Sequence, residues 1–191
     1  MIGLFGFSQT TIYSEDFSGQ NGKGASGTAS GNPNIDVSGI TSYSIDVTDT
    51  NLTTGDYFRV ENGDFEGSDL DGLAIFTTSL INIADFTDVS FTIDVSAEGT
   101  QEDADFLNVE YSIDGGSFVL VQDWNGQGNA TTTLKGNVGR APDGGNNDWR
   151  DETININNLS GSSLVLKISI INNQDNEKTR IERINVEGTP V

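Results

Sequence analysis

Val89-Ser90-Phe91-Thr92-Ile93-Asp94-Val95-Ser96 alternates apolar and polar side chains without a break. Because successive side chains of a strand point to opposite faces, this pattern predicts a strand with one buried and one solvated face. The same alternation runs from Leu107 to Ile113, and Asp114-Gly115-Gly116 then supplies turn residues before the apolar residues 118–121. This second segment therefore predicts an antiparallel hairpin.

Further alternating runs surround this hairpin. Residues 164–170 and 184–186 have a clear strand pattern, and weaker candidates are 11–17, 42–47, 57–61, 73–78 and 153–156. No window of eleven residues has apolar positions at helical spacing, so little helix is expected. The Gly- and Asn-rich stretches 19–34 and 136–150 are expected to be loops. The sequence thus predicts an all-β fold, an antiparallel β-sandwich of jelly-roll type, as a single domain over residues 10–191.

The charge and composition exclude several classes of function. The 191 residues include 29 Asp and Glu, 9 Lys and Arg, and no His or Cys, for a net charge of −20. Such an acidic chain is not expected to bind nucleic acid through phosphates or to bind anionic membranes. The missing His and Cys remove the commonest catalytic bases and nucleophiles, and no carboxylate spacing singles out an acid and a base. We therefore do not expect an enzyme.

The N-terminus has a different character from the rest of the chain. Residues 2–7 are apolar apart from their glycines, and Ser8-Gln9 form a small polar boundary. This resembles the end of a secretory signal peptide, so residues 1–9 are expected to be a signal-peptide remnant outside the sandwich; the alternative is a genuine N-terminal strand. The run is too short to cross a bilayer, and no membrane insertion is expected. The chain is expected to be secreted and to act outside the cell or at the cell surface.

The many carboxylates, without His or Cys, leave calcium as the metal that the side chains favour. Glu15 and Glu182 share strand parity with apolar neighbours and are expected to point inward, where a carboxylate requires a metal or an ionic partner. For Glu182 the alternative to a metal is an ion pair with Arg180 or Arg183. A second candidate group lies in two turns that would have to meet: Asp69, Asp71, Glu102 and Asp105. The alternative for this second group is a pair of solvated turns. Any bound calcium is expected to be structural.

Two tryptophans suggest a ligand site. Trp124 and Trp149 lie among residues that hydrogen-bond hydroxyl groups, with Asp148 and Arg150 flanking the second. Sugars stack on such rings, although either Trp could instead cover the edge of the core. We therefore expect a non-catalytic module that binds a polysaccharide or cell-surface glycan, or acts as an adhesive surface. The alternative is a structural subunit or spacer that self-associates through edge strands.

Motifs spread over most of residues 11–188 resemble one family, a β-sandwich domain of secreted Bacteroidetes proteins. They are Tyr13-Ser14-Glu15-Asp16-Phe17, Gly19-Gln20-Asn21-Gly22-Lys23-Gly24, Phe65-Glu66, Asp69-Leu70-Asp71-Gly72, Glu98-Gly99-Thr100 with Glu102 and Asp105, Tyr111-Ser112-Ile113-Asp114-Gly115-Gly116, Ile171-Asn172-Asn173, Glu177 and Arg180-Ile181-Glu182. Such domains often accompany extracellular endonucleases or polysaccharide-active enzymes, and they are similar to calcium-containing carbohydrate-binding modules. The resemblance implies a jelly roll without catalytic residues. It also implies a calcium site at Glu15 and Glu182, although Glu182-Arg183 stands where the family tends to have Asp-Asn.

Overall fold

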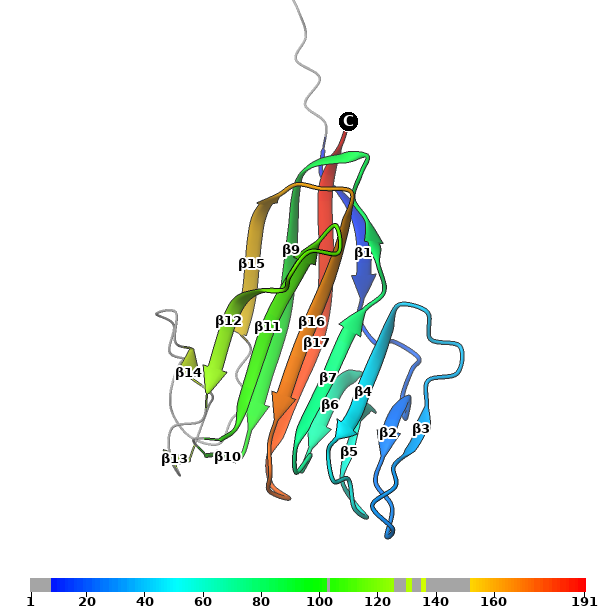
Figure 1. The fold of residues 1–191 in the computed structure, drawn as a ribbon, viewed down its shortest axis with the longest axis vertical. Helices are drawn as coiled ribbons and strands as arrows, with labels where there is room; N and C mark the ends of the chain where they lie inside the picture. Colours follow the sequence, from blue (N-terminus) through cyan, green and yellow to red (C-terminus); the bar gives the residue numbers. More distant parts are fainter. Residues whose placement is uncertain (1–7, 103, 126–129, 132–134, 137–151) are drawn as a thin grey trace, which may run out of the picture.

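The computed structural model describes residues 8–102, 104–125, 130–131, 135–136 and 152–191. Within them, seventeen strands form two large antiparallel sheets that lie face to face, together with one small ribbon (Figure 1). These residues contain no helix, and hence none long and apolar enough to cross a membrane. The expected all-β antiparallel sandwich is confirmed.

The first sheet has eight strands, with the long β17 at its centre. β17 (Lys178–Pro190) pairs with β9 (Phe86–Glu98) along one side. Its other side pairs with β6 (Asp64–Ser68) and then with β1 (Thr10–Glu15). The remaining strands are β15 (Glu152–Leu159) beside β9, and β5 (Tyr57–Glu61), β2 (Gly24–Ser26) and β3 (Asn34–Asp36) in that order beyond β6. The first and last strands of the domain are thus neighbours.

The second sheet has seven strands, in which β11 (Phe106–Ile113) and β16 (Ser163–Ile171) are central. The expected hairpin is present, because β11 pairs antiparallel with β12 (Val119–Asn125). The other members are β14 (Lys135–Gly136), β7 (Leu73–Thr78), β4 (Tyr43–Asp49) and β8 (Ile81–Asn82). A separate ribbon pairs β10 (Thr100–Gln101) with β13 (Ala130–Thr131).

The core lies between the two sheets and is rich in aromatic rings at one point. Phe58 and Phe65 come from the first sheet, Tyr43 and Phe76 from the second, and Phe17 from the segment after β1. The Phe65 ring contacts the other four, at centroid distances of 4.7–5.7 Å. Phe65 therefore joins the two layers of the sandwich.

Several strands were not expected from the sequence. β2 lies inside the stretch predicted to be a loop, and β6 was missed because charged residues and a glycine interrupt its apolar pattern. β3 and β8 are too short to show a period. At the N-terminus, Ser8 and Gln9 are exposed and precede β1, whereas the apolar residues 2–7 lie outside the described residues, so the signal-peptide interpretation stays a prediction.

Candidate functional sites

Glu15 is buried, as expected from its parity, but it already has several hydrogen-bond donors. The backbone N–H of Phe17 and the side-chain amide of Gln20 each donate to Oε1 at 2.8 Å, and the Ser42 hydroxyl donates to Oε2. A buried carboxylate with three donors does not require a metal for its charge to be tolerated.

Glu182 does not point into the core as its parity predicts. A β-bulge between Ile181 and Arg183 gives β17 one extra residue opposite β9, so Ile181 and Ile184 are both buried and Glu182 is partly exposed. Its Oε1 accepts a hydrogen bond of 2.6 Å from the Ser96 hydroxyl. Neither Glu15 nor Glu182 belongs to a group of three or more close acids among the described residues. The expectation of an inward Glu182 is wrong because a bulge reverses strand parity.

A three-carboxylate cluster forms where two connections meet at one end of the sandwich. Glu102 and Asp105 lie between β10 and β11, and Glu177 precedes β17; one carboxylate oxygen from each lies within 4.8 Å of the others. Asp105 and Glu177 are completely buried. Gly99 allows this close approach, because a Cβ there would overlap the backbone oxygen of Asn176. The turn containing Glu177 therefore packs directly against the segment after β9.

Burial and mutual repulsion change the proton affinity of this cluster. Burial, together with the neighbouring Glu102 carboxylate, raises the pKa of Asp105 to about 7. Burial, with smaller contributions from Glu102 and Asp105, likewise raises the pKa of Glu177 to about 8. The backbone N–H groups of Glu102 and Asn173 act in the opposite direction, each donating to one of these two carboxylates. The cluster therefore favours a neutralising partner when it is ionised.

A second acidic cluster involves another residue of the same turn, Asp175. It consists of Asp56, Asp69 and Asp175, again with one oxygen each within 4.8 Å. Asp175 is exposed, and Asp56 is buried with its Oδ2 accepting from the backbone N–H and hydroxyl of Thr53 at 2.6 and 2.8 Å.

The four acids predicted to form one metal site are thus separated in the structure. Asp69 belongs to the second cluster, whereas Glu102 and Asp105 belong to the three-carboxylate cluster. Asp71 belongs to neither of these two groups. The expectation that the two turns bring all four acids together is wrong. Both turns pack against the turn before β17, but Asp69 meets Asp175 there, whereas Glu102 and Asp105 meet Glu177.

The Asp69→Asn substitution is expected to stabilise the protein at pH 8 but not at pH 4. Burial, a hydrogen bond with Asp175 and the charges of Asp56, Asp71 and Asp175 together raise the pKa of Asp69 to about 7. Because the folded-state pKa exceeds the unfolded value, stability falls as pH rises from about 4 to about 7. Asn lacks this charge and tolerates the φ of 48° at this position.

Solvent screens part of the repulsion at Asp69, so the expected gain at pH 8 is about 1 kcal/mol, or about 2–4 °C in Tm. Thermal melts of wild type and variant across this pH range, in the presence of a chelator, measure it. A gain that is the same at pH 4 and pH 8 would contradict the electrostatic explanation.

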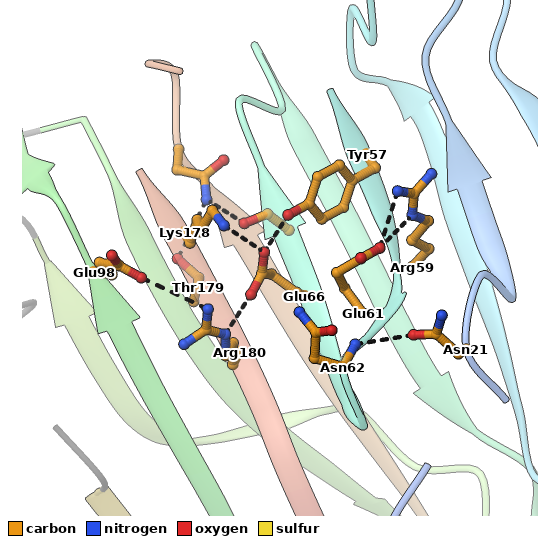
Figure 2. Close-up of polar contacts among 12 residues, drawn as sticks. Asn21, Tyr57, Arg59, Glu61, Asn62, Glu66, Glu98, Lys178, Thr179 and Arg180 are labelled. Carbon is orange, nitrogen blue, oxygen red and sulfur yellow. Dashed lines mark hydrogen bonds and ion pairs between the residues drawn. The ribbon is translucent and has the colours of Figure 1, made fainter. Parts of the chain in front are cut away.

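Another buried carboxylate, that of Glu66, lies on the outer face of the first sheet. The Glu66 side chain is 1% exposed and forms ion pairs with Lys178, at 3.2 Å, and with Arg180. The Tyr57 hydroxyl also donates to Glu66, and Arg180 reaches Glu98 at 3.6 Å (Figure 2). This network crosses β5, β6, β17 and β9, and it holds Glu66 with its charge compensated.

A pocket of about 190 Å³ lies between β12 and β15. Trp124 is 4% exposed and pairs with the buried Leu107 of β11, so its ring faces the inside of the sandwich. Its indole Nε1 is buried and has no hydrogen-bond acceptor among the described residues. Among the described residues, those that line the pocket carry no charged side chain: Val121, Gln122, Trp124, Thr153, Ile154, Asn155 and Ile156. This pocket combines an aromatic ring with neutral hydrogen-bonding groups.

The other predicted ligand residues, Asp148, Trp149 and Arg150, lie outside the described residues. The main residue that periodicity missed is Glu177, which stands between a polar turn and a strand, and so has no apolar neighbours to reveal its burial. Gln122 and Asn155 also had no sequence signal, because the pocket that they line forms between strands distant in the chain.

Comparisons with known proteins show similarity in fold only. Neither a protein-family model nor a curated protein matches this sequence. The K3 cleaved adhesin domain of Lys-gingipain from Porphyromonas gingivalis W83 aligns over 94% of this chain and 99% of its own, with a TM-score of 0.51 and 10% identity. The K1 cleaved adhesin domain of the same protein has a TM-score of 0.46 at 16% identity, covering 94% of this chain and 99% of its own. A carbohydrate-binding module, CBM61 in complex with β-1,4-galactotriose, has a TM-score of 0.42 at 9% identity, covering 68% of this chain and 73% of its own.

Proposed function

We propose that this chain is a non-catalytic binding module that recognises carbohydrate through the pocket between β12 and β15. The pocket lining carries the proposal. Trp124 offers an aromatic ring, and Gln122 and Asn155 offer neutral amides that both donate and accept hydrogen bonds. A neutral ligand with apolar C–H faces and many hydroxyl groups suits this lining, and sugars have both features.

The size and polarity of the pocket agree with a sugar ring as the occupant. A cavity of about 150 Å³ is known to hold a six-membered ring, and this pocket is about 190 Å³. The buried indole N–H of Trp124 has no acceptor in the part of the chain that the structure describes, and a ligand hydroxyl oxygen would supply one. The adhesin domain with a similar fold supports a role in adhesion, which requires binding and no catalysis.

Binding of neutral oligosaccharides tests this proposal. We expect wild type to bind at least one neutral glycan on an array, with the affinity then measured by calorimetry. Gln122→Ala and Asn155→Ala should each weaken that binding about 2- to 10-fold, the loss of one neutral hydrogen bond. The Trp124→Phe change keeps an aromatic ring but removes the N–H, so it should weaken binding; because Trp124 is buried, it should also lower the Tm of the free protein.

Gln9→Ala provides the matched control, because Gln9 is an exposed glutamine outside the pocket. It should bind the same glycan as tightly as wild type. Equal affinity in Gln122→Ala, Asn155→Ala and wild type would exclude this pocket as the binding site. A wild type that binds no glycan would favour the alternative role as a structural spacer.

A further inference from the structure

We infer that Glu102, Asp105 and Glu177 bind one calcium ion that joins the β10–β11 connection to the turn before β17. This inference is independent of carbohydrate binding, because it concerns a different set of residues. The oxygens of the three-carboxylate cluster lie within 4.8 Å of one another. Calcium–oxygen distances are about 2.3–2.6 Å, so ligands of one ion lie up to about 5 Å apart. The spacing therefore fits a single shared ion.

Each carboxylate in the cluster has one oxygen held by a donor and one oxygen without any. The backbone N–H of Glu102 donates to Asp105 Oδ2 at 2.5 Å, that of Asn173 donates to Glu177 Oε2 at 3.0 Å, and the Gln174 amide donates to Glu102 Oε1. The opposite oxygens, Asp105 Oδ1, Glu177 Oε1 and Glu102 Oε2, are buried and have no hydrogen-bond partner among the described residues. The donors thus orient the carboxylates and leave three oxygens available to a cation.

A neighbouring amide oxygen is also left without a donor. Gln101 is 1% exposed; its Nε2 donates to the Glu98 backbone oxygen at 2.9 Å, whereas its Oε1 is buried and has no partner within the described ranges. An amide oxygen is a usual calcium ligand, so Gln101 is a fourth candidate. Buried acceptors without donors are rare in folded proteins, and four in residues 101–105 and 177 indicate a missing positive partner.

The described part of the chain does not supply that positive charge. Among the ion pairs of the described residues, none includes Glu102, Asp105 or Glu177. The buried Glu66, by contrast, has two cationic partners, and the buried Glu15 has three donors. Carboxylates that are buried close together without a cation destabilise the fold when ionised. A bound divalent cation removes this penalty.

The chemistry of the oxygens selects calcium over other metals. The chain has no His or Cys, so no soft or borderline ligand is present. Magnesium demands near-ideal octahedral geometry and retains most of its water, which a closely packed site with several protein oxygens opposes. Calcium accepts six to eight oxygens with loose geometry. The second cluster, Asp56, Asp69 and Asp175, contains none of the unpartnered buried oxygens found among the described residues, so it carries no equivalent inference.

Calorimetry and thermal melts of the full chain, freed of metal with a chelator, test the inference. We expect one equivalent of calcium chloride to bind. At a hundredfold excess over Kd, Tm should rise by about 5–10 °C, with a much smaller rise in magnesium chloride. Glu177→Gln and Asp105→Asn should lower calcium affinity at least tenfold and abolish most of the Tm rise. Each variant removes one of three like charges and keeps the side-chain shape, so the metal-free variants should be at least as stable as wild type.

Asp69→Asn is the matched control, since it removes a carboxylate from the second cluster while leaving the first intact. It should retain the full calcium-dependent rise in Tm. An unchanged wild-type Tm with no heat of binding would overturn the inference. A calcium-dependent rise in Tm that persists in Glu177→Gln but disappears in Asp69→Asn would overturn the inference, because the ion would then bind at the second cluster. An equal rise in Tm with magnesium would overturn the assignment to calcium.

Discussion

Phe65→Ala is expected to destabilise the protein by about 3–5 kcal/mol, a large fraction of the stability of a single domain. Phe65 is completely buried, and its ring contacts Phe17, Tyr43, Phe58 and Phe76 at 4.7–5.7 Å. Because these residues come from both sheets, the substitution opens a cavity between the two layers. The unfolding free energy from urea denaturation measures the effect.

An exposed side chain provides the control for this substitution. Leu80 is 68% exposed, so Leu80→Ala removes a large apolar side chain without opening a cavity and should change stability by about 0.5 kcal/mol or less. If Phe65→Ala and Leu80→Ala changed the unfolding free energy equally, the aromatic cluster would not be the link between the sheets that the structure indicates.

Glu66→Ala is expected to destabilise the protein by about 2–4 kcal/mol. Glu66 is 1% exposed and forms ion pairs with Lys178 and Arg180, whose side chains are 33% and 17% exposed. Removing the carboxylate leaves two cations with less compensation and leaves the Tyr57 hydroxyl without its acceptor. Breaking a buried pair typically costs about 3–5 kcal/mol, and the partial exposure of the cations reduces this.

Two variants distinguish the network from a general effect of acid removal. Glu66→Gln keeps acceptors for Tyr57 and Arg180 and should fall between wild type and Glu66→Ala. Glu61→Ala removes a carboxylate that pairs with Arg59 while both side chains are 27–29% exposed, and it should cost less than about 1 kcal/mol. A Glu66→Ala variant no less stable than Glu61→Ala would show that the network contributes little. Urea denaturation of all three variants gives the comparison.

Local periodicity predicted those strands whose two faces differ in polarity. The segments around Phe91, Val109 and Ile168 became β9, β11 and β16, because one face of each packs in the core while the other faces solvent or polar neighbours. β6 did not follow this rule, since Glu66 is buried by side chains from β5 and β17 rather than by its own strand neighbours. Such burial depends on contacts between distant segments and has no local signature.

For the acidic residues too, some features follow from the sequence and others depend on contacts between distant segments. Composition alone predicted oxygen ligands and excluded nitrogen or sulfur ligands, because the chain has no His or Cys. It did not predict which carboxylates meet. Strand parity placed Glu182 inward, and a bulge between its two neighbours turned it away. Glu102 and Asp105 were expected to join Asp69 and Asp71, but they join Glu177 instead.

The sequence by itself therefore determined the all-β class, the main strands and the chemical type of any metal site, since these follow from side-chain alternation and composition. The tertiary structure decided the grouping of the acids and the position of the Trp124 pocket. Both depend on how the ends of strands far apart in the chain are brought together. One example is the contact of Gly99 with Asn176, where no Cβ fits. This close approach places Glu177 beside Asp105. A periodic pattern reports which face of a strand is buried, but not which other strand buries it.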